Sequence, residues 1–409
     1  MRIASSLLFA RRAGVLICLG IPLLGGALSA QGAAPATGQA TWARALDQLR
    51  SGDTAAALPQ LERLVSANPG NRIYRFELAR ALSRLNRNAR ARYHLDQVRG
   101  ASLSPRERDL VERLDATLAG RRSWSGYFSF RLRPETNGSR QTQDPVVVIG
   151  GRPFSISDTA VGKSTVSTVI RTGFRYAPAG ATRIGAQVAM DAYVKHNDDR
   201  SLRDYQLAAR PGVSIALNPR GRVTGGLLLG TRRAGNRPYS ETFGLYFNHT
   251  RKLGAAGRVH LGGELSRTFR RDDTADIDRH LLFASYTRAI GGTTRVTLSG
   301  FAETNDSAQQ EVAGLRSGIA FSGLHAFEGG LVAGVTLRGE TADRRGVSRV
   351  FGRRRSDRTL AAELSLLHRN IRVGAFAPEI RVGIERNRSN IPLADYTNRT
   401  LSLGFRLSF

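Results

Sequence analysis

The stretch SWSGYFSFRLR, residues 123–133, decides the fold, because small or apolar side chains alternate in it with polar ones. One face of an extended strand here would carry Trp124, Gly126, Phe128, Phe130 and Leu132. The opposite face would carry serine, tyrosine and arginine. A strand with one face suited to lipid and the other to water is typical of a transmembrane β-barrel. We therefore predict that a membrane barrel begins at Ser123 and continues to Phe409.

The same period of two continues to the end of the chain. It predicts strands at 123–133, 165–177, 181–195, 203–217, 220–232, 238–251, 257–270, 278–290, 293–304, 313–326, 330–343, 357–370, 374–388 and 399–409. The count of about fourteen is even, as in bacterial single-chain barrels. A soluble sandwich is the alternative, but its strands average about five or six residues, and arginines in mid-strand need a hydrated lumen. The pattern favours the barrel.

The connections between these strands differ in length. Those after odd strands are the longer ones, such as 134–164 and 344–356, whereas those after even strands are mostly tight, such as Asn218-Pro219, Gly291-Gly292 and Glu328-Gly329. Outer-membrane barrels have short periplasmic turns and longer outer loops. Both ends of the barrel should therefore lie in the periplasm, together with whatever precedes it.

The last strand has a terminal aromatic residue preceded by alternating apolar residues: Leu401, Leu403, Phe405, Leu407 and Phe409. This arrangement resembles the signal that the barrel-assembly machinery recognises on its substrates. A lipid-facing last strand would produce the same pattern, and the two interpretations are compatible.

Residues 39–120 have a helical period. Trp42, Ala45, Leu46 and Leu49 recur at helical spacing, and Asn68-Pro69-Gly70 ends a second helix. Helix pairs of about 34 residues with this pattern resemble tetratricopeptide repeats. We predict a small all-α periplasmic domain whose groove could hold an extended client segment. Its candidate contacts are Tyr74, Leu78, Leu82 and Tyr93. The alternative is a plug or spacer below the barrel.

The pattern of residues 1–30 predicts a signal peptide. Arg2, Arg11 and Arg12 precede an apolar run from Ala13 to Leu24, and small residues follow. The chain has one cysteine, Cys18, and it follows the bulky Ile17, which argues against lipidation. No later stretch of about 18 apolar residues exists that would form a membrane helix.

The formal charge of +28 comes from 61 basic residues, of which only Lys163, Lys195 and Lys252 are lysine. Export excludes nucleic acid as the partner that such a charge would otherwise suggest. Two explanations remain. The arginines reflect a general arginine bias and line a watery lumen, or loop arginines bind lipopolysaccharide phosphates or an acidic passenger.

No catalytic or metal-binding motif stands out. The seven histidines include no pair at metal-ligand spacing. A set of His280, Asp276 or Asp278, and Ser285 lacks the sequence context of a nucleophile. The acidic pairs Asp198-Asp199 and Asp272-Asp273 could bind calcium, although solvated loop turns are the simpler use. We expect neither an enzyme nor a cofactor.

The chain resembles the surface lipoprotein assembly modulators (Slam) in its architecture, a short helical region followed by a barrel, and in two short sequence elements. The first element is Arg131-Leu132-Arg133-Pro134 followed by Glu135-Thr136-Asn137, in which Pro134, Thr136 and Asn137 match the family's motif after its first strand. The second is the glycine-rich stretch from Ile149 to Ile156. The helical region is shorter than in the best-known members.

The resemblance implies a non-enzymatic outer-membrane translocon that helps deliver a lipoprotein or a soluble binding protein to the cell surface. Its partners would be that client, the outer-membrane lipid with its lipopolysaccharide, and the assembly machinery. A polysaccharide-export porin and a passive diffusion channel with a helical plug remain as alternatives.

Overall fold

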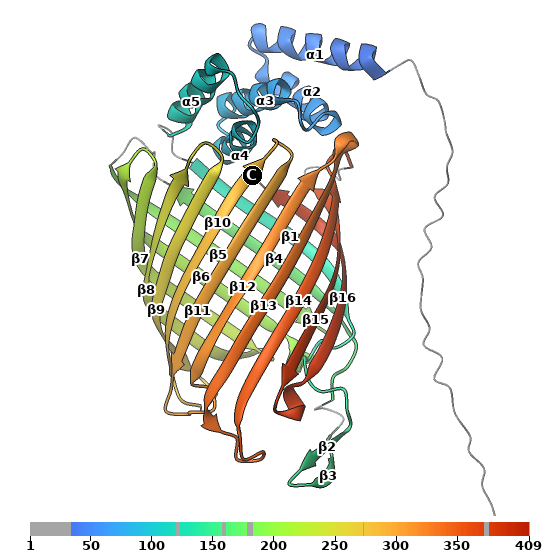
Figure 1. The fold of residues 1–409 in the computed structure, drawn as a ribbon, viewed down its shortest axis with the longest axis vertical. Coiled ribbons are helices and arrows are strands. Elements are labelled where there is room, and N and C mark those ends of the chain that lie inside the picture. Colours follow the sequence, from blue (N-terminus) through green and yellow to red (C-terminus); the bar gives the residue numbers. More distant parts are fainter. Residues whose placement is uncertain are drawn as a thin grey trace, which may run out of the picture.

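The computed structural model describes residues 34–119, 123–157, 161–177, 183–272, 274–371 and 376–408. In it, five helices precede a closed barrel of fourteen antiparallel strands, which confirms the predicted fold class (Figure 1). The expected signal peptide and Phe409 lie outside the described residues. Within the described part of the chain, none of the helices has the length and apolar character that a membrane span requires.

The helical region consists of α1 (Ala34–Arg50), α2 (Thr54–Ala67), α3 (Arg72–Arg84), α4 (Asn88–Arg99) and α5 (Pro105–Ala119). Side-chain caps set three of the helix starts: Asp53 accepts from Ala56, Asn71 accepts from Ile73 and Tyr74, and Ser104 exchanges hydrogen bonds with Glu107. The apolar faces meet in one core that includes Leu61, Leu78, Leu82, Leu95 and Leu118. The helical period seen in the sequence is thus the buried face of each helix.

The barrel strands run in chain order around the wall. They are β1 (Ser123–Glu135), β4 (Thr165–Ala177), β5 (Ile184–Asn197), β6 (Asp204–Asn218), β7 (Gly221–Ala234), β8 (Arg237–Leu253), β9 (Gly257–Arg270), β10 (Ile277–Ile290), β11 (Thr294–Asp306), β12 (Gly314–Ala326), β13 (Leu331–Val347), β14 (Arg354–His368), β15 (Ala377–Ser389) and β16 (Tyr396–Ser408). Pairing of β1 with β16, for example Phe130 opposite Phe405, closes the barrel.

Two local features were not predicted. The long first connection contains a small hairpin, β2 (Val146–Ile149) paired with β3 (Arg152–Ser155). The connection between β7 and β8 is a two-residue turn, Gly235-Asn236, although it follows an odd barrel strand. Both of its residues have positive φ, 56° and 67°, as a tight hairpin of this hand requires. Outer connections are therefore mostly, but not always, the longer ones.

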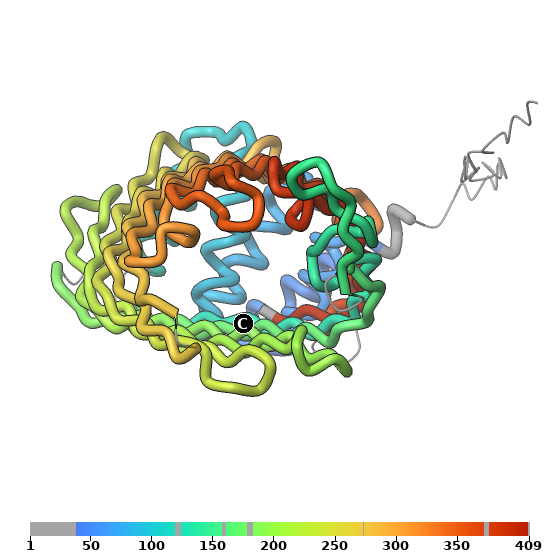
Figure 2. Tube along the Cα trace, turned by 90° about the horizontal axis from the view of Figure 1, so that it is seen from below, coloured from blue at the N-terminus to red at the C-terminus, as the bar shows by residue number. Residues whose placement is uncertain are grey.

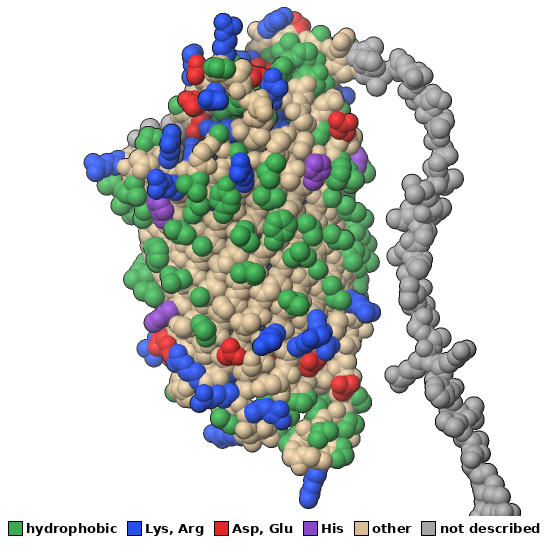
Figure 3. All heavy atoms as spheres, viewed as in Figure 1, with side chains coloured by type: hydrophobic (Ala, Val, Ile, Leu, Met, Phe, Trp, Pro, Cys, Tyr) green, Lys and Arg blue, Asp and Glu red, His purple; other side chains and the backbone are tan. Residues whose placement is uncertain are grey.

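The two faces of the wall have opposite chemistry. Along β10 the even-numbered residues are exposed and the odd-numbered ones are partly buried, so Leu282 points outward with 61% of its surface exposed. Ile319 and Leu360, each 69% exposed, belong to the same outer face. A band of apolar side chains covers the middle of the barrel, between charged bands above and below (Figure 3). Such a band is the lipid-facing belt of an outer-membrane barrel.

The helical region lies across one end of the barrel, at the side where β1 begins and β16 ends (Figures 1 and 2). The β2–β3 hairpin projects from the opposite end (Figure 1). The connections at the helical end are mostly short, as in Asn218-Pro219-Arg220-Gly221 between β6 and β7. Short turns mark the periplasmic end of such a barrel, so the helices lie on the periplasmic side.

Candidate functional site: the periplasmic mouth and the lumen

Contacts between side chains join the helical region to the periplasmic rim of the barrel. The guanidinium carbon of Arg295 on β11 lies 4.5 Å from the ring centroid of Tyr93 on α4. Lys252 on β8 pairs with Asp115 on α5, with 2.6 Å between Nζ and Oδ2. Gly291, in the turn before β11, donates its backbone N–H to the carbonyl of Gly100 at 3.0 Å. A second ion pair joins the barrel to the helices, between Arg258 on β9 and Asp96 on α4 at 3.1 Å. The helices are therefore docked on the rim.

A cavity of about 980 Å³ lies between the docked helices and the rim, and we call it the mouth chamber. Its helical side is formed by Glu62, Val65, Ser66, Leu78, Arg87, Ala89, Arg90, Tyr93 and His94. Its barrel side is formed by Ser125, Gly126, Arg295, Leu324, Val332, Leu367, Arg369, Ala377, Arg406 and Leu407. Val332 and Leu367 each follow an outward-facing, exposed leucine, Leu331 and Leu366, so their own side chains face the lumen. The chamber is thus the covered periplasmic entrance of the lumen.

The chamber has a strongly positive lining. Five arginines contribute to it, and the only carboxylate among its lining residues belongs to Glu62, which pairs with Arg90 at 2.6 Å. Burial and the nearby guanidinium groups of Arg75, Arg369, Arg90 and Arg295 hold the pKa of His94 well below its usual value. The imidazole is therefore neutral and the positive charge of the chamber resides on its arginines.

The four predicted groove residues have different surroundings in the structure. Leu82 is completely buried in the helical core, so its side chain is not available to a client. Tyr74 packs against Trp42, with 4.9 Å between ring centroids, and is not among the residues lining the chamber. Leu78 borders the chamber, but its side chain is 1% exposed and belongs to the helical core. Tyr93 lines the chamber and is only partly buried. A helical period marks the inner face of a helix, but it does not distinguish a core contact from a groove contact.

The lumen wall carries a chain of alternating charges that crosses several strands. Its successive links are Arg210–Glu264 (3.0 Å), Glu264–Arg279 (3.1 Å), Arg279–Glu303 (2.9 Å), Glu303–Arg316 (3.9 Å), Arg316–Glu340 (3.0 Å), Glu340–Arg338 (3.1 Å) and Arg338–Glu385 (2.7 Å). The carboxylates are nearly buried by the arginines, as the 7% exposure of Glu303 shows. Mid-strand arginines predicted a hydrated lumen, and the structure shows which carboxylates they meet.

The predicted motif after the first strand forms the anchor of the long first loop, residues 136–164. Asn137 is fully buried; its backbone N–H donates to Oδ1 of Asn398 at 3.0 Å, and its Nδ2 donates to the carbonyl of Gln141 at 2.7 Å. Thr136 accepts a hydrogen bond from the backbone N–H of Arg399 at 2.9 Å. Further along the loop, Arg140 pairs with Glu385 in the lumen wall at 2.7 Å. The motif therefore ties the loop to β16 at the outer mouth.

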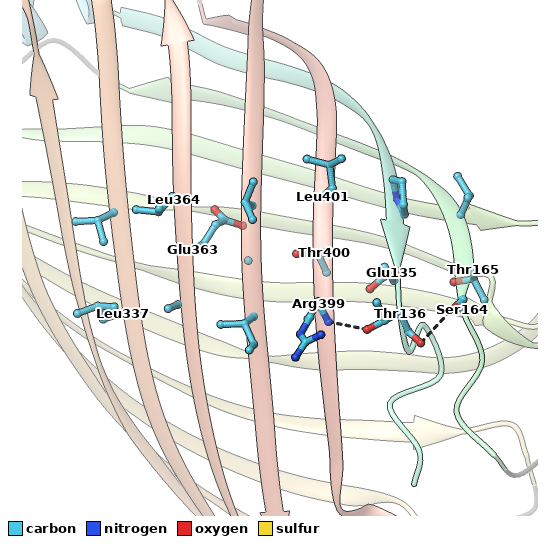
Figure 4. Close-up of a pocket in the computed structure, with 17 residues that line it drawn as sticks. Glu135, Thr136, Ser164, Thr165, Leu337, Glu363, Leu364, Arg399, Thr400 and Leu401 are labelled. Carbon is cyan, nitrogen blue, oxygen red and sulfur yellow. Dashed lines mark hydrogen bonds between the residues drawn. The ribbon is translucent and has the colours of Figure 1, made fainter. Parts of the chain in front are cut away.

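A hollow of about 930 Å³ lies beside this motif on the barrel wall (Figure 4). Leu337, Leu364 and Leu401 are among the residues lining it, and all three are strongly exposed. At its edge Thr136 accepts the hydrogen bond from Arg399, and Ser164 donates to the Thr136 carbonyl at 3.3 Å (Figure 4). Because its leucines belong to the lipid-facing belt, membrane acyl chains would fill this hollow.

Asp273 lies outside the described residues, and the other candidate catalytic and calcium-binding residues form no common site. On β10 His280 faces outward and Ser285 faces the lumen, so the wall separates them. The carboxylate of Asp199 accepts from the backbone N–H and hydroxyl of Ser201 at 2.9 and 2.7 Å. That of Asp272 is paired with Arg270. Among the described residues there is no group of three or more metal-ligating side chains. These acidic residues cap turns.

These features define a class: an outer-membrane β-barrel whose lumen is covered on the periplasmic side by a small helical domain. Within that class, the chain belongs to the surface lipoprotein assembly modifier family, since the family's model matches residues 201–409. It is also 23% identical over 375 residues to a surface lipoprotein assembly modifier from Moraxella catarrhalis, covering 90% of this chain and 72% of that protein. This family and fold point to a role other than catalysis.

Solved outer-membrane barrels are similar to the chain at low sequence identity. The channel DcaP of Acinetobacter baumannii is 8% identical with a TM-score of 0.41, over 70% of this chain and 97% of that one. OccAB1 of Acinetobacter baumannii is 10% identical with a TM-score of 0.38, over 70% of this chain and 97% of that one.

Proposed function

We propose that this protein helps deliver one particular lipoprotein, or a soluble binding protein, across the outer membrane to the cell surface. The observation that carries the proposal is the mouth chamber, which lies between a docked helical domain and the lumen. A client arriving in the periplasm meets the helical domain before it meets the barrel. The Moraxella catarrhalis relative is named as an assembly modifier of surface lipoproteins, and the chain covers most of it.

The geometry supports a non-covalent mechanism. The helix pairs, which we propose to act as a short tetratricopeptide-like repeat, present Tyr93 to an extended segment. Beyond the chamber, the charge chain of the lumen wall keeps the passage polar, because each of its arginines, Arg210, Arg279, Arg316 and Arg338, already has a carboxylate partner and binds a passing chain weakly. Loop 136–164, anchored by Asn137, lies where the client leaves. The protein positions and releases its client without changing a bond.

A diffusion channel with a helical plug is the second candidate, and the ion pairs that dock the helices on the rim favour it. Planar-bilayer conductance separates the two functions. A steady open pore in the full-length protein supports diffusion, whereas a lumen that stays closed to small ions refutes it. A gene for a polysaccharide synthase beside this one would instead support export of a polysaccharide.

The proposal is tested by removing residues 39–119 while keeping residues 1–38 and the barrel. Surface delivery of a candidate client, an exported protein encoded next to this gene, is measured by labelling intact cells. We expect an inserted barrel, recognised by its heat-modifiable migration, that no longer delivers the client. Delivery at the level of the full-length protein would refute the proposal. The control is Arg349→Gln, in the loop between β13 and β14, which should deliver the client at the normal level.

We also propose that the last strand is the contact for the barrel-assembly machinery. Leu403 and Phe405 are exposed on the outer face, at 51% and 38%, so their side chains are available during assembly. Leu407 continues the same face. Replacing Phe409 by Asp should slow insertion, measured by pulse-chase labelling of the heat-modifiable form, and insertion at the normal rate would refute the assignment.

A further inference from the structure

The arginines of the mouth chamber differ from those of the lumen wall in their partners. Most wall arginines meet a carboxylate within about 3 Å, as Arg279 meets Glu303 at 2.9 Å. Among the described residues, Arg87, Arg295 and Arg406 have no carboxylate partner. Arg87 and Arg406 are also exposed. The chamber therefore holds guanidinium groups that can accept an anionic ligand without first breaking an ion pair.

The chamber is apolar between these charges. On the barrel side Leu324, Val332 and Leu367 line it. On the helical side Val65 and Leu78 lie behind the surface, each 1% exposed in the helical core. At about 980 Å³ it is at the upper end of the range of ligand pockets, which is about 300–1,000 Å³. A ligand that fits such a lining has several carboxylates with apolar groups between them.

The position of the chamber decides between a peptide and a membrane lipid. Most of its barrel residues, Arg295, Val332 and Leu367 among them, face the lumen, and the wall separates these from the acyl chains that cover the outer face. Gly126 and Leu407, at the edge where β1 meets β16, belong to the outer face. The helical cover leads from the periplasm to the lumen, which is the path of a polypeptide. One buried polar group adds to this: His94 is 8% exposed, lines the chamber, and its Nδ1 has no hydrogen-bond partner among the described residues. A peptide N–H or C=O can satisfy it, depending on the tautomer.

We infer that the mouth chamber binds an extended acidic segment of the passenger polypeptide, with carboxylates at Arg87, Arg295 and Arg406 and apolar side chains between them. This inference rests on the proposed delivery function, and it names the chemistry by which the client is selected. A client with such a segment is attracted from the periplasm by the positive mouth before it contacts the wall, as charged ligands are guided toward sites of opposite charge.

The test uses the full-length protein in detergent micelles and a fluorescein-labelled peptide of ten residues that alternates Glu and Leu. The comparison peptide has Gln in place of every Glu. Fluorescence anisotropy should show binding of the Glu peptide that weakens as salt is raised, and much weaker binding of the Gln peptide. Arg295→Gln and Arg406→Gln should each reduce the affinity about tenfold, because each removes a hydrogen bond between charged groups. Arg349→Gln, in the outer loop between β13 and β14, is the matched control and should bind normally.

Arg295→Lys separates charge from packing, since it keeps the charge at this position; it should retain most of the affinity. Equal binding of the two peptides, or normal binding by both glutamine variants, would overturn the inference. Displacement of the Glu peptide by phosphatidylglycerol micelles, with no displacement by phosphatidylcholine micelles, would also overturn it and assign the chamber to lipid. A further combination of results is that the peptide binds as expected while deletion of the helical domain leaves delivery unchanged. That combination would refute the proposed function but not the binding site.

Discussion

Arg295 on the barrel rim lies over the ring of Tyr93 on α4, with 4.5 Å between the guanidinium carbon and the ring centroid. Arg369 donates to the hydroxyl of the same tyrosine at 3.5 Å. One side chain of the helical domain is thus held by two arginines of the barrel, one on β11 and one directly after β14. Tyr93 therefore fixes how the cover lies on the mouth, and it also lines the chamber.

Tyr93→Leu should loosen the helical domain from the rim, because the cation–π contact is worth about 0.5–2 kcal/mol and leucine cannot replace it. Hydrogen–deuterium exchange of α4 in the full-length protein should rise accordingly. Tyr93→Phe keeps the ring and should retain most of the protection. Unchanged exchange in the leucine variant would show that the ion pairs of Asp96 and Asp115 are sufficient for docking.

Locking the cover should stop delivery. A Cβ placed at Gly292, in the turn before β11, would lie 4.0 Å from the Cβ of Ala101 after α4, which is within the range of a disulfide. The φ of 77° at Gly292 strains any side chain there, and the Gly292→Cys single variant measures that cost. We expect the variant with Ala101→Cys and Gly292→Cys to form this bond in the oxidising periplasm. Surface delivery should be lost and should return when a reductant is added. Each single-cysteine variant is a control, and delivery by the locked protein would show that the client does not displace the helices.

Acidification should destabilise the helical domain through His94. Its pKa in the folded protein lies below its usual value, so the unfolded chain binds the proton more readily. Stability is therefore complete above about pH 6.5 and falls as the pH is lowered toward the folded pKa, by at most about 1.4 kcal/mol per pH unit. Far-UV circular dichroism of helix melting at several pH values measures this. His94→Leu should flatten the dependence, whereas His280→Leu on the outer wall should keep it; identical slopes in all three proteins would contradict the assignment.

The charge chain of the lumen should stabilise the barrel more than an exposed ion pair does. Glu264 is 8% exposed and pairs with both Arg210 and Arg279, so Glu264→Gln should cost about 1–3 kcal/mol. Glu241 pairs with Arg271 at an exposed site, and Glu241→Gln should cost about 0–1 kcal/mol. The urea concentration at which the heat-modifiable form is lost compares the two. An equal loss in both variants would mean that the lumen hydrates its charges as fully as the outer surface does.

The first loop should lose its anchor when Asn137 is changed. Asn137→Ala removes the bond from the buried Nδ2 to the Gln141 carbonyl and leaves the start of the loop without this internal support. The local cost of about 1–3 kcal/mol should raise trypsin cleavage of residues 136–164 on intact cells. Ser139→Ala removes only a 3.4 Å contact to the same side chain and should cleave at the normal rate. Equal cleavage would show that Asn398 and Thr136 hold the loop without the Asn137 side chain.

The strand pattern could be predicted closely from sequence because alternation is a local property. The strands predicted at 165–177 and 257–270 agree with β4 and β9 residue for residue. The hairpin β2–β3 was not predicted, because it lies in a loop and its four-residue strands are too short to show a clear alternation of apolar and polar residues. The motif at Pro134, Thr136 and Asn137 was visible, but its bond to Asn398, 261 positions away in the chain, was not.

The sequence by itself therefore determined the barrel, its approximate strand count, its orientation and the presence of a helical domain, because hydrophobic period and loop length are encoded between near neighbours. Only the tertiary structure decided which side chains of the helical domain are buried in its core and which line the chamber. Burial of Leu78 and Leu82 in the core and the position of Tyr93 at the chamber follow from how α2, α3 and α4 pack on one another and on the rim. The charge of three arginines at the mouth is unpaired because the fold places no carboxylate of the described residues close to them. The distances between arginines and carboxylates depend on contacts between residues far apart in the chain.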